Sequence, residues 1–124
     1  MSTIKANDLQ SASGGIPTVK GQRLIPTAWV NFNPSTSTIN DSEGVSSITN
    51  ISAAADTINF TTVMVSSNYA VVGASNGSTT GINAGRMVCP YNMGTNSVSI
   101  VNQQAYNSAA STPLCCVAIL GGQA

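Results

Sequence analysis

The stretch Asp56–Val65, DTINFTTVMV, has the clearest β-strand pattern in the chain. Every second residue from Ile58 to Met64 falls on one face of an extended backbone. Tyr69–Ala74 follows after a short polar turn and is also rich in residues that favour strands. Together these two stretches predict a β-hairpin with a short loop.

Working outward from these stretches, AWVNFN at residues 28–33 also has the two-residue period of a β-strand. Val30 and Phe32 share one face of this predicted strand, together with Ala28. Trp29 then lies on the opposite face with Asn31. Shorter strand candidates follow at 45–49, at 86–89, which Pro90 ends, and at 97–102. In the last of them Val98 and Ile100 share one face.

The run LCCVAIL at Leu114–Leu120 is almost continuously apolar, which predicts a strand buried on both faces. Ile39–Gly44 is instead rich in turn-forming residues and predicts a turn. No segment combines helical periodicity with capping signals. Seven or eight short strands separated by Gly, Asn, Ser and Pro therefore predict an all-β fold, an antiparallel β-sandwich or jelly roll, at residues 27–124.

Residues 1–26 differ from the rest of the chain. They are mostly polar, and SASGGIP at 11–17 has the composition of a flexible joint. The segment has too few apolar residues to form a core of its own. We expect an N-terminal arm, which either frays or becomes ordered by docking on, or intertwining with, another subunit.

The composition combines 42% hydrophobic residues with only 6% charged residues and zero net charge. Ser, Thr, Asn and Gly make up 54 of the 124 residues. The four Lys and Arg residues form no basic patch, which argues against nucleic-acid binding. Met1–Gln10 has no apolar leader and no apolar run is long enough to cross a bilayer, so we expect synthesis in a cytoplasm and no membrane insertion.

Catalytic chemistry has few residues to draw on, because the chain contains no histidine and only four carboxylates. Histidine-dependent triads are therefore excluded. Asp41 and Glu43 would share a face if extended, as in a glycosidase pair or a weak calcium site, but two solvated acids are the simpler interpretation. Cys89, Cys115 and Cys116 lack metal-binding spacing and read as reduced, core-filling thiols. We expect no enzyme activity, no cofactor and no metal.

Three aromatic residues are candidates for contact with a saccharide or a neighbouring subunit. Trp29 lies on the polar face of its predicted strand, where its ring could stack on a sugar or pack in an interface. Tyr91 and Tyr106 lie in polar segments next to Asn92 and Asn107, which combine a ring with an amide. Ordinary packing is the alternative for all three.

Four landmarks occur in a fixed order along the chain. They are WVNFN at 29–33, VSSIT at 45–49, NFTT at 59–62 and YAVV at 69–72. This order resembles a β module of bacteriophage tail-fibre and appendage proteins, and STIK at 2–5 with the later Leu9-Gln10 and Gly14-Gly15 resembles the start of many such chains. The sequence departs from that family in two predicted loops, at Pro34–Thr36 and Asn50–Ala55.

The resemblance implies a virion structural protein, a homotrimer that contacts other virion proteins through residues 1–26 and that contacts the host surface. Capsid decoration or a head fibre is the first alternative, because fold alone does not distinguish these positions in the particle. A free-standing saccharide-binding module is the second. A polysaccharide depolymerase that uses Asp41 and Glu43 is the least favoured.

Overall fold

The computed structural model describes Ala12 and residues 18–19, 22–23, 26–77, 85–104, 108–109 and 112–122. Every helix or strand assigned within these ranges is a β-strand, and they contain no helix that could cross a membrane. The strands are β1 (Thr18–Val19), β2 (Gln22–Arg23), β3 (Ala28–Asn33), β4 (Thr38–Glu43), β5 (Val45–Ser52), β6 (Ala55–Phe60), β7 (Tyr69–Asn76), β8 (Gly85–Tyr91), β9 (Ser97–Gln104), β10 (Ser108–Ala109) and β11 (Leu114–Gly121).

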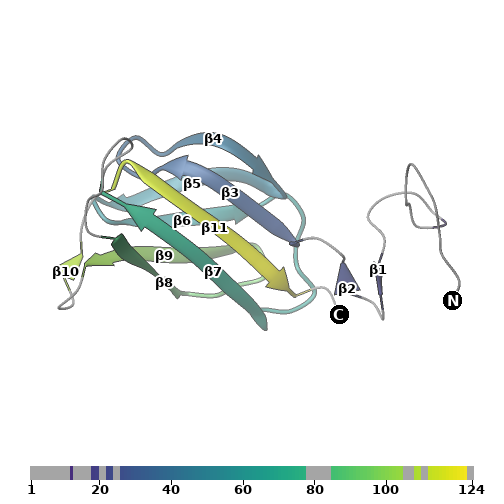
Figure 1. The fold of residues 1–124 in the computed structure, drawn as a ribbon. Helices are drawn as coiled ribbons and strands as arrows, with labels where there is room; N and C mark the ends of the chain where they lie inside the picture. Colours follow the sequence, from purple (N-terminus) through teal and green to yellow (C-terminus); the bar gives the residue numbers. More distant parts are fainter. Residues whose placement is uncertain are drawn as a thin grey trace, which may run out of the picture.

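Nine of these strands form one antiparallel sheet. Eight of them follow one another in the order β4-β3-β11-β7-β8-β9-β6-β5, and the short β10 pairs with β9 beside this path. The sheet curls until its two halves face each other across a common core, so that it is a nearly closed barrel (Figure 1). We call β4-β3-β11-β7 the first wall and β8-β9-β6-β5 the second wall. The predicted all-β antiparallel fold class is confirmed.

The walls are joined differently on their two sides. On one side, β7 and β8 share only two residue pairs, Ser75 with Arg86 and Asn76 with Gly85. On the other side the chain passes from β4 into β5 through Gly44 alone, which has a φ of 71°. A Cβ at Gly44 would lie 2.8 Å from the Thr27 carbonyl oxygen, so this corner requires glycine for both its conformation and its space.

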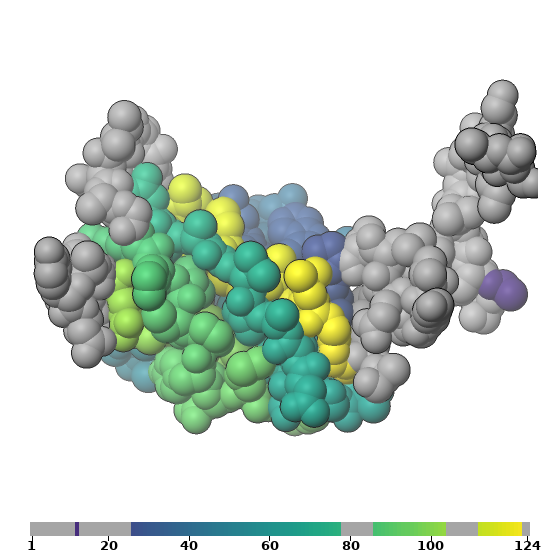
Figure 2. Space-filling model, turned by 60° about the horizontal axis from the view of Figure 1, so that its bottom comes forward, coloured from purple at the N-terminus to yellow at the C-terminus, as the bar shows by residue number. Residues whose placement is uncertain are grey.

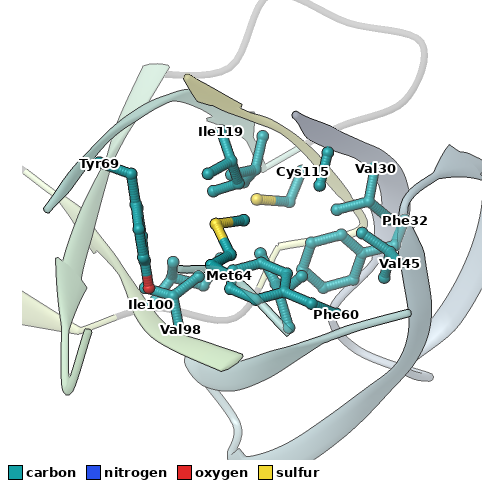
Figure 3. Packing of buried hydrophobic residues seen from close by; sticks show 13 residues of the cluster. Val30, Phe32, Val45, Phe60, Met64, Tyr69, Val98, Ile100, Cys115 and Ile119 are labelled. Carbon is teal, nitrogen blue, oxygen red and sulfur yellow. The ribbon is translucent and has the colours of Figure 1, made fainter. Parts of the chain in front are cut away.

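The hydrophobic core lies between the walls, and both walls contribute to it (Figure 3). Phe60 and Tyr69 meet edge to face with ring centroids 5.8 Å apart, and the Tyr69 hydroxyl donates to the Gly94 carbonyl at 2.9 Å. The most deeply buried apolar side chains are Ala28, Val30, Phe32, Ile58, Val98, Ile100, Cys115 and Ile119. The inward faces predicted for Val30 and Phe32 and for Val98 and Ile100 are therefore confirmed.

The predicted turn at 39–44 is wrong, because most of it is strand β4. β4 pairs with β3 through a register that shifts between Asn31 and Phe32. An edge strand has only one neighbour, so polar and turn-forming residues are tolerated there, and Ile39 alone packs against the core.

The predicted hairpin between 56–65 and 69–74 is also wrong. β6 ends at Phe60 and pairs with β5 and β9, whereas β7 pairs with β11 and β8. Residues 61–68 instead carry the chain from the second wall to the first, with the Met64 amide donating to Thr95 and the Val65 amide to Gly122. Pro90 likewise does not end its strand, since β8 continues to Tyr91.

Candidate binding surface

Three neighbouring strands, β3, β11 and β7, lie side by side at the surface (Figure 2). Their outward side is mostly apolar, and we call it the outer face. Its cross-strand rows follow from the register. Trp29 lies opposite Ala118, which lies opposite Val72. Asn31, Cys116 and Ala74 form the next row, and Leu120 lies opposite Ala70.

β11 explains how this surface arises. The sequence predicts burial on both faces of the strand, but the structure buries only Cys115, Val117 and Ile119. Their neighbours Cys116 and Leu120 are exposed, so that prediction is wrong for the second face. A central strand therefore presents apolar residues to solvent.

The outer face contains a shallow groove of about 580 Å³. Small residues form its floor along β11, where Cys116 and Ala118 face outward. Trp29 on β3 and Val72 on β7 contribute larger side chains on either side, and Pro26 also lines the groove. The Val72 side chain is 56% exposed, which is unusual for valine in a strand with a neighbour on each side.

One side of the outer face is polar and acidic. The Asn40 amide donates to the Asn31 side-chain oxygen at 2.9 Å. On β4, Asp41 lies opposite Asn31 and Glu43 lies opposite Trp29, and both carboxylates are exposed. An apolar groove with two acids along one border can contact a ligand that combines apolar groups with cations.

The two predicted contact residues that the structure describes, Trp29 and Tyr91, do not lie in one site. Trp29 faces outward beside Asn31, as its alternation predicts, and is half-buried. Tyr91 ends β8 and is 37% exposed, and both β11 and β7 separate β3 from β8 in the sheet. Tyr106 lies outside the described residues. Of the two described residues, Trp29 belongs to the outer face and Tyr91 does not.

Sequence analysis missed the remaining groove residues, on β11 and β7. A signal for them was present in LCCVAIL, whose outward positions are as apolar as its inward ones. That signal alone does not distinguish a doubly covered strand from one whose second face is uncovered.

A second cluster of polar groups lies inside the barrel. Asp56 on β6 is fully buried, and its Oδ1 accepts a hydrogen bond from the Asn50 amide at 3.3 Å. Burial raises the pKa of Asp56, and hydrogen bonds from Asn50 and Ser37 offset part of that rise. Asn102 is also fully buried, and its side-chain oxygen accepts from the Cys115 thiol at 3.6 Å.

The three cysteines are free thiols in different surroundings. Cys115 is buried, Cys89 is half-buried and Cys116 is exposed, so the predicted core-filling role fits Cys115 best. Burial, followed by the nearby charges of Cys116 and Asp56, raises the pKa of the Cys115 thiol to about 12. Among the described residues, no group of three or more His, Cys, Asp and Glu side chains is placed to hold a metal.

No family model, curated protein or solved structure matches this chain.

Proposed function

We propose that the chain is a non-catalytic structural module of a bacteriophage particle, a tail-fibre or appendage component that assembles as a homotrimer through its outer face. The uncovered apolar surface of β3, β11 and β7 carries this proposal, because large exposed apolar patches on small proteins mark contact surfaces. The four sequence landmarks from Trp29 to Val72 support the assignment to a virion.

Assembly through a face is favoured over assembly through a strand edge. β4 and β5 end the sheet, and both have irregular register: β4 is bulged opposite Asn31, and β5 twice, near Ser47 and near Ser52. Bulges and exposed charges on edge strands oppose edge-to-edge pairing. Asp41 and Glu43 place two such charges on β4.

The outward side of β5 and β6, together with Ser99 of β9, has a different chemistry, whereas β8 exposes Met87 and Tyr91. Thr57 and Ser99 share a hydrogen bond of 3.0 Å between their hydroxyls. The Asn59 amide donates to the hydroxyls of Ser47 at 3.0 Å and Thr49 at 2.9 Å. These groups satisfy one another and remain compatible with water. The contrast between this polar side and the outer face supports assembly through the outer face.

Sedimentation equilibrium of the full chain tests the association. We expect a mass of about three times 12.6 kDa at micromolar concentration. Val72→Asp places a charge on the outer face and should raise the dissociation constant at least about tenfold. Thr49→Asp, on the exposed side of the second wall, is the matched control and should leave it unchanged.

A wild-type chain that sediments as a monomer at micromolar concentration would contradict assembly through the outer face. The assignment to a virion has its own test, which is mass spectrometry of purified particles together with an electron cryomicroscopy map. Density on a tail organ would support the tail-fibre assignment, and density on the shell would support the capsid decoration or head-fibre alternative. Absence from the particle would contradict both.

A saccharide-binding module is the second candidate, and the neighbourhood of Trp29 favours it. The half-buried Trp29 lies on the same strand as Asn31, whose side-chain oxygen accepts a hydrogen bond from the Asn40 amide. On the neighbouring strand β4, Glu43 lies directly opposite Trp29. A ring beside amide and carboxylate groups suits stacking on a sugar with hydrogen bonds to its hydroxyls. A multivalent glycan array tests this candidate: binding that Trp29→Ala abolishes supports it, and an array without signal contradicts it.

A further inference from the structure

The charges of this chain divide sharply between its two parts. Residues 1–25 contain three cations and one carboxylate, a formal charge of +2. Residues 26–124 contain one cation, Arg86, and three carboxylates, a formal charge of −2. The zero net charge of the whole chain therefore conceals a basic segment and an acidic barrel.

The exposed acids of the barrel lie where the apolar groove is. Of its three carboxylates Asp56 is fully buried, which leaves Asp41 and Glu43 at the surface. Both lie on β4, opposite the outer-face residues Asn31 and Trp29. The border of the groove is therefore the negative part of the barrel surface, and it is complementary to a cationic partner.

The outer face of a second barrel does not supply one, because the only cation after residue 25 is Arg86, on β8 of the second wall. The first 25 residues contain the other three cations of the chain. Lys20 follows Val19, and Arg23 precedes Leu24 and Ile25, so cations and apolar residues lie close together in this segment. This combination suits a surface that is apolar along β11 and acidic along β4. The apolar residues of this segment are Ile4, Leu9, Ile16, Val19, Leu24 and Ile25, with Met1.

We propose that the outer face binds residues 1–25 of a second copy of this chain, with Lys20 and Arg23 meeting Asp41 and Glu43. This inference rests on the proposed function and names the occupant of the assembly surface. Within one chain, β1 and β2 pair with each other and with no strand of the barrel. They lie beyond Pro26, clear of the outer face (Figure 1), so contact with a neighbour is favoured.

Mixing two charge-reversed full-length variants tests the exchange between copies. The first variant carries Asp41→Lys with Glu43→Lys, and the second carries Lys20→Glu with Arg23→Glu. In each variant alone the segment and the face have like charge, so the dissociation constant should rise at least about tenfold. In an equimolar mixture, the basic segment of the first meets the acidic face of the second, and the acidic segment of the second meets the basic face of the first. Two of the three contacts in a mixed trimer then become complementary and one stays repulsive, so association should recover part, but not all, of the loss.

Two further measurements belong to the same experiment. Trp29 is the only tryptophan, so its emission should shift to shorter wavelength as the mixture associates, because the groove becomes covered. Wild-type association should weaken when salt rises from about 50 to 500 mM, because screening acts on exposed ion pairs. A control variant, Ser47→Lys with Thr49→Lys on the second wall, should associate like wild type.

The outcomes separate this inference from the proposed function. If wild type associates and Val72→Asp prevents it, but neither charge reversal has an effect, assembly through the outer face stands and the segment is not its occupant. If reversal shifts Trp29 emission in a protein that stays monomeric, and mixing restores nothing, the segment binds its own barrel and exchange is overturned. If wild type never associates and no emission shift occurs, both proposals fail.

Discussion

Cys115 and Cys116 show at the residue scale how strand alternation separates two identical side chains. Cys115 points into the core and packs in the hydrophobic cluster, whereas Cys116 lines the outer groove. Only the thiolate reacts with alkylating reagents. A raised pKa and burial therefore act together to protect Cys115, whereas the Cys116 side chain is exposed.

Alkylation with iodoacetamide at pH 8, followed by peptide mass spectrometry, should modify Cys116 first. We expect Cys115 to react on the order of 100-fold more slowly, and to become reactive only when the chain is unfolded. Cys116→Ser should remove the fast phase. Equal rates for the two thiols in the folded protein would contradict the strand register described for β11.

Asp56 should make stability depend on pH. Burial raises its pKa above the ordinary value of 3.8, so the folded state favours the neutral acid. The stabilising contribution is complete below the unfolded pKa and is lost as pH rises through the raised folded pKa. Asp56→Asn keeps a neutral acceptor for Asn50 and should remove this dependence.

Urea unfolding of both proteins from about pH 4 to pH 7.5 checks the prediction. The free energy of unfolding of wild type should fall relative to that of Asp56→Asn as pH rises. Parallel curves would show that Asp56 does not titrate differently in the folded and unfolded states.

At the scale of elements, the corner at Gly44 turns the chain from β4 of the first wall into β5 of the second. Gly44 has a positive φ and no room for a Cβ, so Gly44→Ala should cost about 1–3 kcal/mol of unfolding free energy. Gly94→Ala is the control, because the added Cβ meets only the Ser97 oxygen at 3.4 Å. Its cost should stay below about 1 kcal/mol. Equal costs in thermal unfolding would contradict a special role for the corner.

The elements that sequence analysis predicted correctly are those with one apolar face. β3 was found at its full length, and β9 was found through Val98 and Ile100, because burial on one side leaves a period of two in the sequence. β4 was missed because an edge strand needs little apolar surface. The predicted β6–β7 hairpin failed because neighbours in sequence were assumed to pair, whereas residues 61–68 cross between the walls.

The candidate site was predictable only in part, for a related reason. Alternation placed Trp29 outward, since that depends on its own strand alone. Its neighbours on β11 and β7 come from strands more than 40 residues away along the chain, and only the sheet order brings them beside it. A single sequence contains no signal for that order.

For the whole molecule, one core shared by both walls implies one cooperative unfolding unit. Phe32 comes from the first wall and Ile58 and Ile100 from the second, and all three are fully buried. Phe32→Ala should therefore cost about 3–5 kcal/mol and lower a single transition without splitting it. Met87→Ala, at a side chain that is 65% exposed, should cost less than about 1 kcal/mol.

Differential scanning calorimetry, with fluorescence and circular dichroism as independent probes, checks this point. Coincident transitions are expected for wild type and for Phe32→Ala. Two resolved transitions in Phe32→Ala would show that the walls unfold separately.

The pairing of β3 with β11 also fixes how the barrel would respond to tension. The Thr27 amide and hydroxyl bond to the carbonyls of Ile119 and Gly121, both at 2.8 Å, so β3 begins where β11 ends. Antiparallel ladder bonds run across the strands. A force applied between residues 26 and 122 would load these hydrogen bonds one after another, in the unzipping geometry, and not all at once, as in the shear geometry. Tension applied between those two points would therefore separate β3 from β11 one hydrogen bond at a time.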